Sequence, residues 1–203
     1  MSFLHLVDKR AAALAVACLA ASGAPAQPAK SNQERFAACL VCHGEAGRST
    51  QPLTPSLAGQ PSFYAITQLF LFREGRRSNE AMTAQAKGMS DDDLRAFSDL
   101  IGKLPPPPAP AENVTEPQRM ARGAALAQQH RCASCHGADY AGGQQVARLA
   151  YQREDYLTKA LTEFRSGKRL GYTSAMSETL LGIQPDALQD VAHYLANLPG
   201  PAP

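Results

Sequence analysis

Apolar residues recur along this chain at helical spacing. The stretches SFYAITQLFLFREG (62–75) and EDYLTKALTEFRSG (154–167) place apolar side chains on one face and end at a glycine, which predicts two helices. Residues 90–104 and 185–198 predict a last helix in each half of the chain, with acidic residues in the first turn, where the helix dipole favours them. No stretch alternates apolar and polar residues with a period of two, so the sequence predicts an all-α fold.

Two polar motifs predict where the first helix of each half begins. SNQE (31–34) and TEPQ (115–118) both have the form of a capping box, in which two side chains satisfy free N–H groups at a helix start. Pro117 suits the first turn, because the N–H that proline lacks is unpaired there in any case. We therefore expect one helix to run from SNQE toward Cys39 and another to begin at TEPQ.

The predicted helices belong to one unit that occurs twice. Cys39 and Cys132 are 93 residues apart, and FREGRR (72–77) returns as FRSGKR (164–169) at an offset of 92. An offset this constant indicates two copies of one fold. The proline run LPPPPAP (104–110) between them predicts an extended, semi-rigid spacer. The expected division is a leader of residues 1–26, a first domain of 27–104, a proline-rich linker of 105–114 and a second domain of 115–203.

The N-terminus has the pattern of a secretory signal peptide. Lys9 and Arg10 precede an apolar run that is too short to span a bilayer, and a small-residue cleavage pattern ends at Ala26. Cleavage there would place the mature chain in the periplasm. A lipoprotein anchored at Cys18 is the alternative, but Ala15 replaces the bulky aliphatic residue expected at the −3 position.

The overall charge excludes two classes of partner. The chain has 20 basic and 18 acidic residues, a formal net charge of +2, and this balance fits neither a nucleic-acid binder nor a polybasic membrane anchor. No segment after the leader is apolar for long enough to cross a membrane. Each copy is small and has no tryptophan, and domains of this size usually depend on a metal, a cross-link or a cofactor.

The chemistry is concentrated in CLVCHG (39–44) and CASCHG (132–137). On a helix, residues i and i+3 share a face, so both thiols of a motif can reach one object. The C-x-x-C-H pattern is that of covalent haem attachment, with two thioethers and an adjacent histidine for the iron. Glycine after each histidine would let the backbone pass close to the porphyrin edge. The residues assigned by this pattern are Cys39, Cys42 and His43 in the first copy and Cys132, Cys135 and His136 in the second.

Three other interpretations of the thiols are weaker. Zinc would need both thiol pairs in one closed site, yet the pairs lie in separate copies. A redox dithiol requires neither the histidine nor a duplication. Two short-loop disulfides would be strained and would leave His43 and His136 unexplained.

The repeat also selects a methionine for the second face of each iron. Met82 and Met176 correspond to each other, because each precedes an equivalent leucine by twelve residues. Met89 aligns with Ile183, and Met120 precedes the second motif, so core packing explains these two better. We expect Met82 and Met176 to be the axial ligands opposite the histidines. An iron with both faces filled transfers electrons rather than binding substrate.

The residues together resemble the dihaem cytochromes of the cytochrome c4 type, which have two class I cytochrome c domains in tandem. The resemblance rests on the paired CxxCHG motifs, PSLAGQ (55–60), the FREGRR pair and the two methionine segments. It implies two all-helical domains packed face to face with the haem propionates near their interface. It also implies two covalent haem c groups with His/Met ligation, and periplasmic electron transfer, often toward a terminal oxidase.

Several residues depart from this pattern or have two interpretations. The second copy has Ala147 where the first has Pro55, which puts the backbone support of His136 in doubt and could make the two haem potentials differ. Basic residues before the methionines could neutralise haem propionates or could be solvated helix ends. They are Arg76, Arg77, Lys168 and Arg169. His130 and His193 have no counterpart in the first copy, so we expect them to be surface or hydrogen-bonded core histidines.

The predicted function is therefore a periplasmic carrier of single electrons and not an enzyme, with redox proteins as partners. These would be the periplasmic face of a membrane oxidase or reductase, or a dehydrogenase. One alternative is the cytochrome subunit of a periplasmic dehydrogenase, such as a sulfide-oxidising flavoprotein. A haem enzyme with peroxidase or thiosulfate-oxidising activity is the other; it would need an open iron or a cysteine ligand, and all four cysteines of the two motifs are already used.

Overall fold

The computed structural model describes residues 30–110, 115–169 and 174–199. The expected signal peptide, including Cys18, and the last four residues of the expected linker lie outside these ranges. In the described part of the chain no helix is both long and apolar enough to cross a bilayer. The same residues form helices and no strand, apart from one isolated bridge between Gly143 and Val146.

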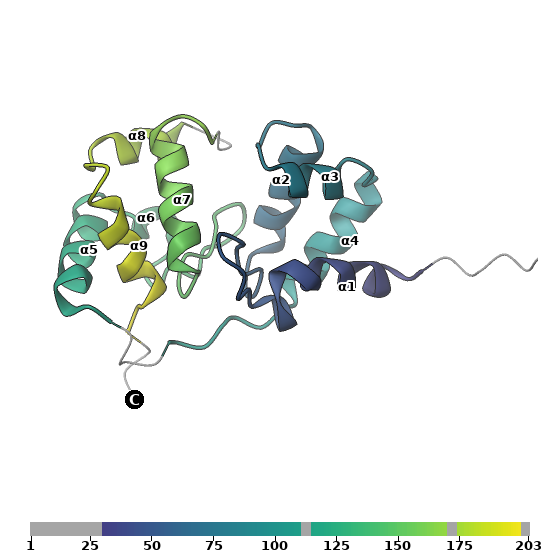
Figure 1. Ribbon diagram of the computed structural model, residues 1–203, viewed down its shortest axis with the longest axis horizontal. Coiled ribbons are helices and arrows are strands. Elements are labelled where there is room, and N and C mark those ends of the chain that lie inside the picture. Colours follow the sequence, from purple (N-terminus) through teal and green to yellow (C-terminus); the bar gives the residue numbers. More distant parts are fainter. Residues whose placement is uncertain (1–29, 111–114, 170–173, 200–203) are drawn as a thin grey trace, which may run out of the picture.

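The helices form two groups that lie beside each other as two lobes (Figure 1). The first lobe contains α1 (Asn32–His43), a short 3₁₀ turn η1 (Glu45–Gly47), α2 (Ser62–Arg73), α3 (Glu80–Ala86) and α4 (Asp91–Gly102). The second contains α5 (Pro117–Gln129), α6 (Ala133–His136), α7 (Glu154–Arg165), α8 (Ala175–Leu181) and α9 (Leu188–Ala196). The fold is the expected all-α arrangement of two similar units.

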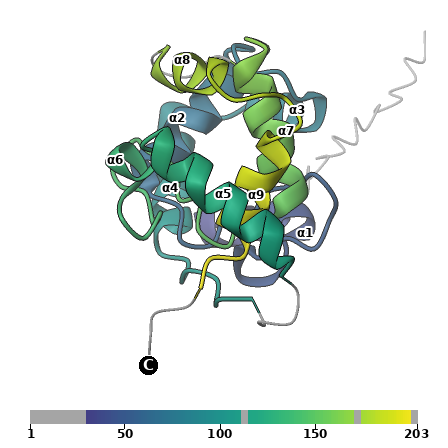
Figure 2. The same cartoon turned by 90° about the vertical axis from the view of Figure 1, so that its left-hand side faces the viewer.

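Each lobe has its own hydrophobic core. In the first, α1 and α2 both pack on α4, and the core includes Phe36, Leu69 and Phe97. In the second, α5 and α7 both pack on α9, as Figure 2 shows for α5 and α9, with Leu188 and Leu195 fully buried. The repeated sequence thus folds into a repeated packing arrangement, and the two cores are separate clusters.

Most of the predicted helices are confirmed. The SNQE capping box is present, with Ser31 and Glu34 bonding each other's backbone N–H groups at the start of α1. Helices α2 and α7 end before Gly75 and Gly167, which both have a positive φ. Residues 105–110 have no helix, as the prolines require.

Two helix starts differ from the prediction. Helix α5 begins at Pro117 with Glu116 as its N-cap, and the Glu116 side chain makes no cap hydrogen bond. Helix α9 begins three residues later than Pro185, because residues 185–187 form a turn. The second CxxCH motif runs from Cys132, the N-cap of α6, to His136, and Arg131, with a φ of +54°, separates it from α5.

Candidate haem-binding sites

Both motif histidines are buried and are held in the same way. The Nδ1 atom of His43 lies 2.8 Å from the carbonyl oxygen of Pro55, and that of His136 lies 2.9 Å from the carbonyl of Ala147. A carbonyl can only accept, so each Nδ1 carries the proton and each Nε2 keeps a free lone pair. Burial lowers the pKa of both imidazoles, although the carbonyl contact opposes the effect. Neutral imidazoles with a free Nε2 are suited to ligate iron.

The doubt about His136 is thereby resolved against the sequence-based expectation. Ala147 supports His136 as Pro55 supports His43, because the bond uses a backbone carbonyl that any residue supplies. Proline at this position is not required for the contact. The structure shows no difference in histidine support that would separate the two haem potentials.

The four cysteines of the motifs are free, and one of each pair contacts the core of its lobe. Cys39 and Cys132 are half-buried against the two core clusters, and Cys42 and Cys135 are exposed. Burial raises the pKa of the Cys39 and Cys132 thiols. Each motif thus has one sulfur at the core and one at the surface.

The two methionines selected by the repeat lie at equivalent places. Met82 is in the first turn of α3 and Met176 in the first turn of α8, two short helices that the sequence patterns did not predict. Both side chains are half-buried and pack against the core cluster that the half-buried cysteine of the same lobe also touches. Met89 packs on the first core as well, so core contact alone does not separate it from Met82.

The glycines after the histidines have a structural role that differs from the expected one. Gly44 has a φ of +82°, and a Cβ placed on it would lie 2.0 Å from the carbonyl oxygen of Arg48. Gly137 has a φ of +84°. These residues end the motif helices in a left-handed turn that L side chains rarely adopt. Chain reversal explains both glycines without reference to the porphyrin.

Of the four basic residues before the methionines, two converge between the lobes. Arg169 is only 5% exposed, and it donates to the hydroxyls of Tyr64 (3.0 Å) and Tyr156 (3.3 Å). Arg77 donates to Tyr156 at 2.7 Å. Arg76 and Lys168 are exposed.

This arginine pair lacks an anion. Within the described ranges no carboxylate forms an ion pair with Arg77 or Arg169, although a buried guanidinium normally has one. Each instead lies over a phenylalanine ring, Phe72 and Phe164, at 4.4 and 4.6 Å from the centroid. An anionic group brought between the lobes, such as a haem propionate, would meet this unbalanced charge, so the residues present fit haem.

The two other histidines of the described residues differ in their contacts. His193 is buried, donates from Nδ1 to Glu154 at 2.8 Å, and accepts from the Glu116 N–H through Nε2. It is the hydrogen-bonded core histidine that we expected. His130 departs from that expectation: it is half-buried beside Gly182, and its buried Nε2 makes no hydrogen bond.

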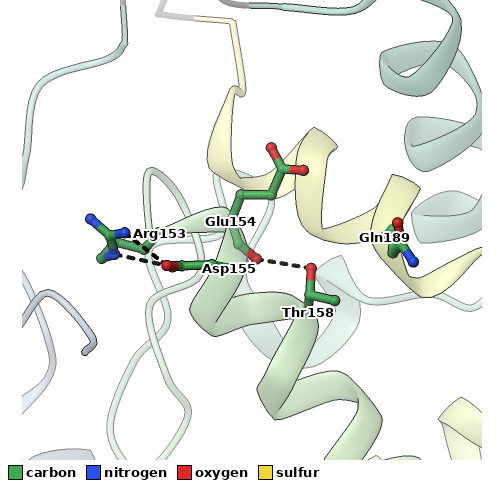
Figure 3. A pocket seen from close by; sticks show the side chains of 5 residues that line it. All are labelled: Arg153, Glu154, Asp155, Thr158 and Gln189. Carbon is green, nitrogen blue, oxygen red and sulfur yellow. Dashed lines mark hydrogen bonds and ion pairs between the residues drawn. The ribbon is translucent and has the colours of Figure 1, made fainter. Parts of the chain in front are cut away.

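One pocket lies away from the proposed haem-binding residues. It is an open depression of about 610 Å³ at the start of α7, with Gln189 of α9 on its far side (Figure 3). Arg153 turns toward Asp155, and the Thr158 hydroxyl donates to the backbone oxygen of Glu154. The Glu154 carboxylate is in turn bonded to Arg119 and His193, so the charged groups of the depression are paired within the chain.

The fold and these sites define a class of protein: a c-type cytochrome with two class I domains, each built around a CxxCH motif. Comparison with known proteins agrees. The cytochrome c family profile matches residues 120–199. The chain is 30% identical over 171 residues to cytochrome c4 of Thiocapsa roseopersicina, covering 79% of this chain and 86% of that one. It is 32% identical over 204 residues to the thiosulfate dehydrogenase electron acceptor of Thiomonas intermedia (strain K12), covering 92% and 90%.

A solved structure shows the same arrangement. Reduced recombinant cytochrome c4 from Pseudomonas stutzeri superimposes with a TM-score of 0.75 at 25% identity, covering 82% of this chain and 96% of that one. The chain belongs to the cytochrome c4 family. It is a dihaem electron-transfer protein and not an enzyme, and its cofactors are two covalently attached haem c groups.

Proposed function

We propose that each lobe binds one haem through its own motif and its own methionine. Cys39 and Cys42 form the thioethers in the first lobe, and His43 and Met82 hold the iron from opposite sides. In the second lobe these roles belong to Cys132 and Cys135, and to His136 and Met176. The observation that carries the proposal is the pair of buried histidines, each with Nδ1 bonded to a carbonyl and Nε2 free, at equivalent positions of the repeat.

Bound haem supplies an iron that changes between the ferrous and ferric states and so stores one electron. The chain's residues set how readily it does so. A methionine sulfur favours the ferrous state, and the carbonyl contact on Nδ1 raises the basicity of the histidine. Because both ligands are held by packed side chains, little rearrangement accompanies a change of charge.

Arg77 and Arg169 are proposed to bind the haem propionates between the lobes. Arg169 is buried and Arg77 is half-buried, and neither forms an ion pair with a carboxylate among the described residues, which supports this role. The exposed Arg76 and Lys168 are assigned to solvent. A guanidinium bonds a carboxylate with two parallel hydrogen bonds, which fixes the edge of the haem as well as its charge.

Substitution of the methionines tests the ligand assignment. Met82→His and Met176→His should each lower the potential of one haem in a redox titration and leave the other nearly unchanged, because nitrogen favours the ferric state more than sulfur does. Met89→His is the matched control in the first lobe and should move neither potential. A Met82→His protein with unchanged potentials would show that another residue ligates that iron.

The donor is proposed to be a thiosulfate-oxidising dehydrogenase. The support is the similarity over nine tenths of both chains to a protein named as a thiosulfate dehydrogenase electron acceptor. In this proposal the partner oxidises thiosulfate and this chain accepts the electrons. Adding thiosulfate and a thiosulfate dehydrogenase to the oxidised protein should reduce both haems, whereas thiosulfate alone should not. A terminal oxidase is the proposed acceptor, and reduced protein should be reoxidised by membranes that contain one.

Export is proposed to depend on residues 1–26, with cleavage after Ala26. The pattern of basic residues, apolar run and small residues supports it. N-terminal sequencing of protein isolated from the periplasm should begin at Gln27, and a lipid-modified N-terminus at Cys18 would contradict it.

A further inference from the structure

The two lobes are joined by a pair of reciprocal amide contacts. The Gln60 side chain donates from Nε2 to the carbonyl of Arg148 (2.9 Å) and accepts the N–H of the same residue through Oε1 (3.1 Å). The Gln152 side chain does the same to Ser56 of the other lobe, at 2.9 and 2.8 Å. Each glutamine therefore satisfies both backbone groups of one residue across the contact.

These contacts follow the internal repeat. Gln60 and Gln152 are equivalent at an offset of 92, and so are Ser56 and Arg148. Each glutamine reaches the residue four positions before its counterpart, so the pair is related by an approximate twofold axis. Because the bonds are made to backbone groups, they persist although Ser56 and Arg148 have unlike side chains.

The contacts are buried, so losing one of them costs more free energy than losing an exposed hydrogen bond. Gln60 is 7% exposed and Gln152 is 5% exposed. Loss of a buried partner leaves a backbone N–H and a carbonyl unsatisfied, which is more costly than the loss of a solvated hydrogen bond. Water cannot replace the amide without the two lobes separating.

We call these two contacts, each made of two hydrogen bonds from one glutamine side chain, the clamps. The backbone of the two lobes is closely packed around them. A Cβ on Gly59 would lie 2.9 Å from the Cα of Pro106 and 3.1 Å from the Cδ of Arg148. Two further bonds cross nearby, from the Leu53 N–H to Asp155 and from Arg153 to the carbonyl of Ser49. Neither bond has an equivalent at the repeat offset among the described residues. They hold the lobes together but do not follow the approximate twofold axis.

We propose that Gln60 and Gln152 are positioning residues for electron transfer between the two haems: together they lock the lobes in one relative orientation, and neither clamp opens alone. The inference rests on the proposed haem sites. Electron tunnelling falls off exponentially with distance, so a lock on the lobes fixes the rate at which one haem passes its electron to the other.

Amide hydrogen exchange tests the lock directly. In Gln152→Met, which keeps the length of the side chain and removes its hydrogen bonds, the Ser56 amide should exchange about tenfold faster or more. If the clamps open together, the Arg148 amide should accelerate by a similar factor, although Gln60 is intact. The reciprocal Gln60→Met should give the same result for Ser56. An Arg148 amide that keeps its protection in Gln152→Met would overturn the lock.

A matched control separates the lock from general loss of stability. Val191→Ala removes buried volume in the second core, which contains neither glutamine, and should speed exchange in α9 while the Ser56 amide keeps its protection. If Val191→Ala frees Ser56 as strongly as Gln152→Met does, the effect is global unfolding and the proposal fails.

The electron-transfer part has its own measurement. After flash reduction of one haem in the oxidised protein, the electron should equilibrate between the haems more slowly in Gln60→Met and Gln152→Met than in the unaltered protein or in Val191→Ala. The two midpoint potentials should not change, because no proposed ligand is touched. Unchanged exchange between haems would overturn the positioning role and leave the ligand assignment intact, whereas failure of the methionine substitutions would overturn the ligands and leave the amide result standing.

Discussion

Substitution of Gly123 by alanine should destabilise the second lobe, against the expectation from helix propensity. Gly123 lies in the middle of α5, where it faces α9. A Cβ at this position would lie 2.1 Å from the carbonyl oxygen of Asp190 and 2.6 Å from the Cβ of Tyr194. The nearest atom belongs to the backbone of a packed helix, so no side-chain rotation relieves the clash.

The magnitude follows from two opposing effects. Alanine in place of glycine stabilises a helix interior by about 1 kcal/mol. Overpacking a core costs about 3 kcal/mol at the upper end, which applies here because the backbone of α9 has to move. The net loss should be about 2 kcal/mol, which lowers the midpoint of thermal unfolding of a domain of this size by roughly 10 °C.

Thermal unfolding of the holoprotein, followed by circular dichroism and by haem absorbance, measures this loss. Gly88→Ala is the control, because Gly88 has an ordinary φ and open space around its Cα, and alanine there should raise stability by about 0.4–1 kcal/mol. The two substitutions therefore have opposite signs. A Gly123→Ala protein as stable as the Gly88→Ala protein would refute the close approach of α5 and α9.

Three further predictions concern individual contacts. Pro55→Ala should leave the potential of the first haem unchanged in a redox titration, because the His43 contact uses the backbone carbonyl and the second lobe already has alanine there; a large shift would restore a role for the proline ring. Burial raises the pKa of Tyr140 to about 12, so the buried neutral phenol contributes stability below pH 10 that is lost as the pH rises toward 12. Tyr140→Phe should therefore lose less stability than the unaltered protein between pH 10 and 12 in urea unfolding. The hydrogen bond from Arg35 lowers the pKa of Asp93, so the α1–α4 ion pair stabilises above the ordinary carboxyl pKa near 3.8 and is lost below it. In Asp93→Asn the free energy of unfolding should fall less as the pH is lowered below 3.8. An unchanged pH dependence would show that the ion pair contributes nothing.

The assignment of two haem sites was accessible from the sequence because its determinants are local and duplicated. Each CxxCH motif spans five residues, and the repeat offset then selected Met82 and Met176 from the four methionines that follow the expected leader. The main helices were equally accessible, since apolar periodicity and glycine stops report on local conformation. The helix starts were predicted less well, because the N-cap of α5 is Glu116 and a turn occupies residues 185–187, where the pattern predicted the start of the last helix.

What joins the lobes depends on the tertiary structure alone. Gln60 and Gln152 are ordinary polar residues in loops, and only the meeting of the lobes reveals that each binds the other's backbone. The same holds for Arg169, which the sequence left undecided between a propionate ligand and a solvated helix end and which the structure buries. A site formed by residues that are neighbours in the sequence can therefore be predicted from the sequence alone. Contacts between residues about ninety positions apart cannot be predicted in this way, because they depend on how the two folded lobes pack against each other.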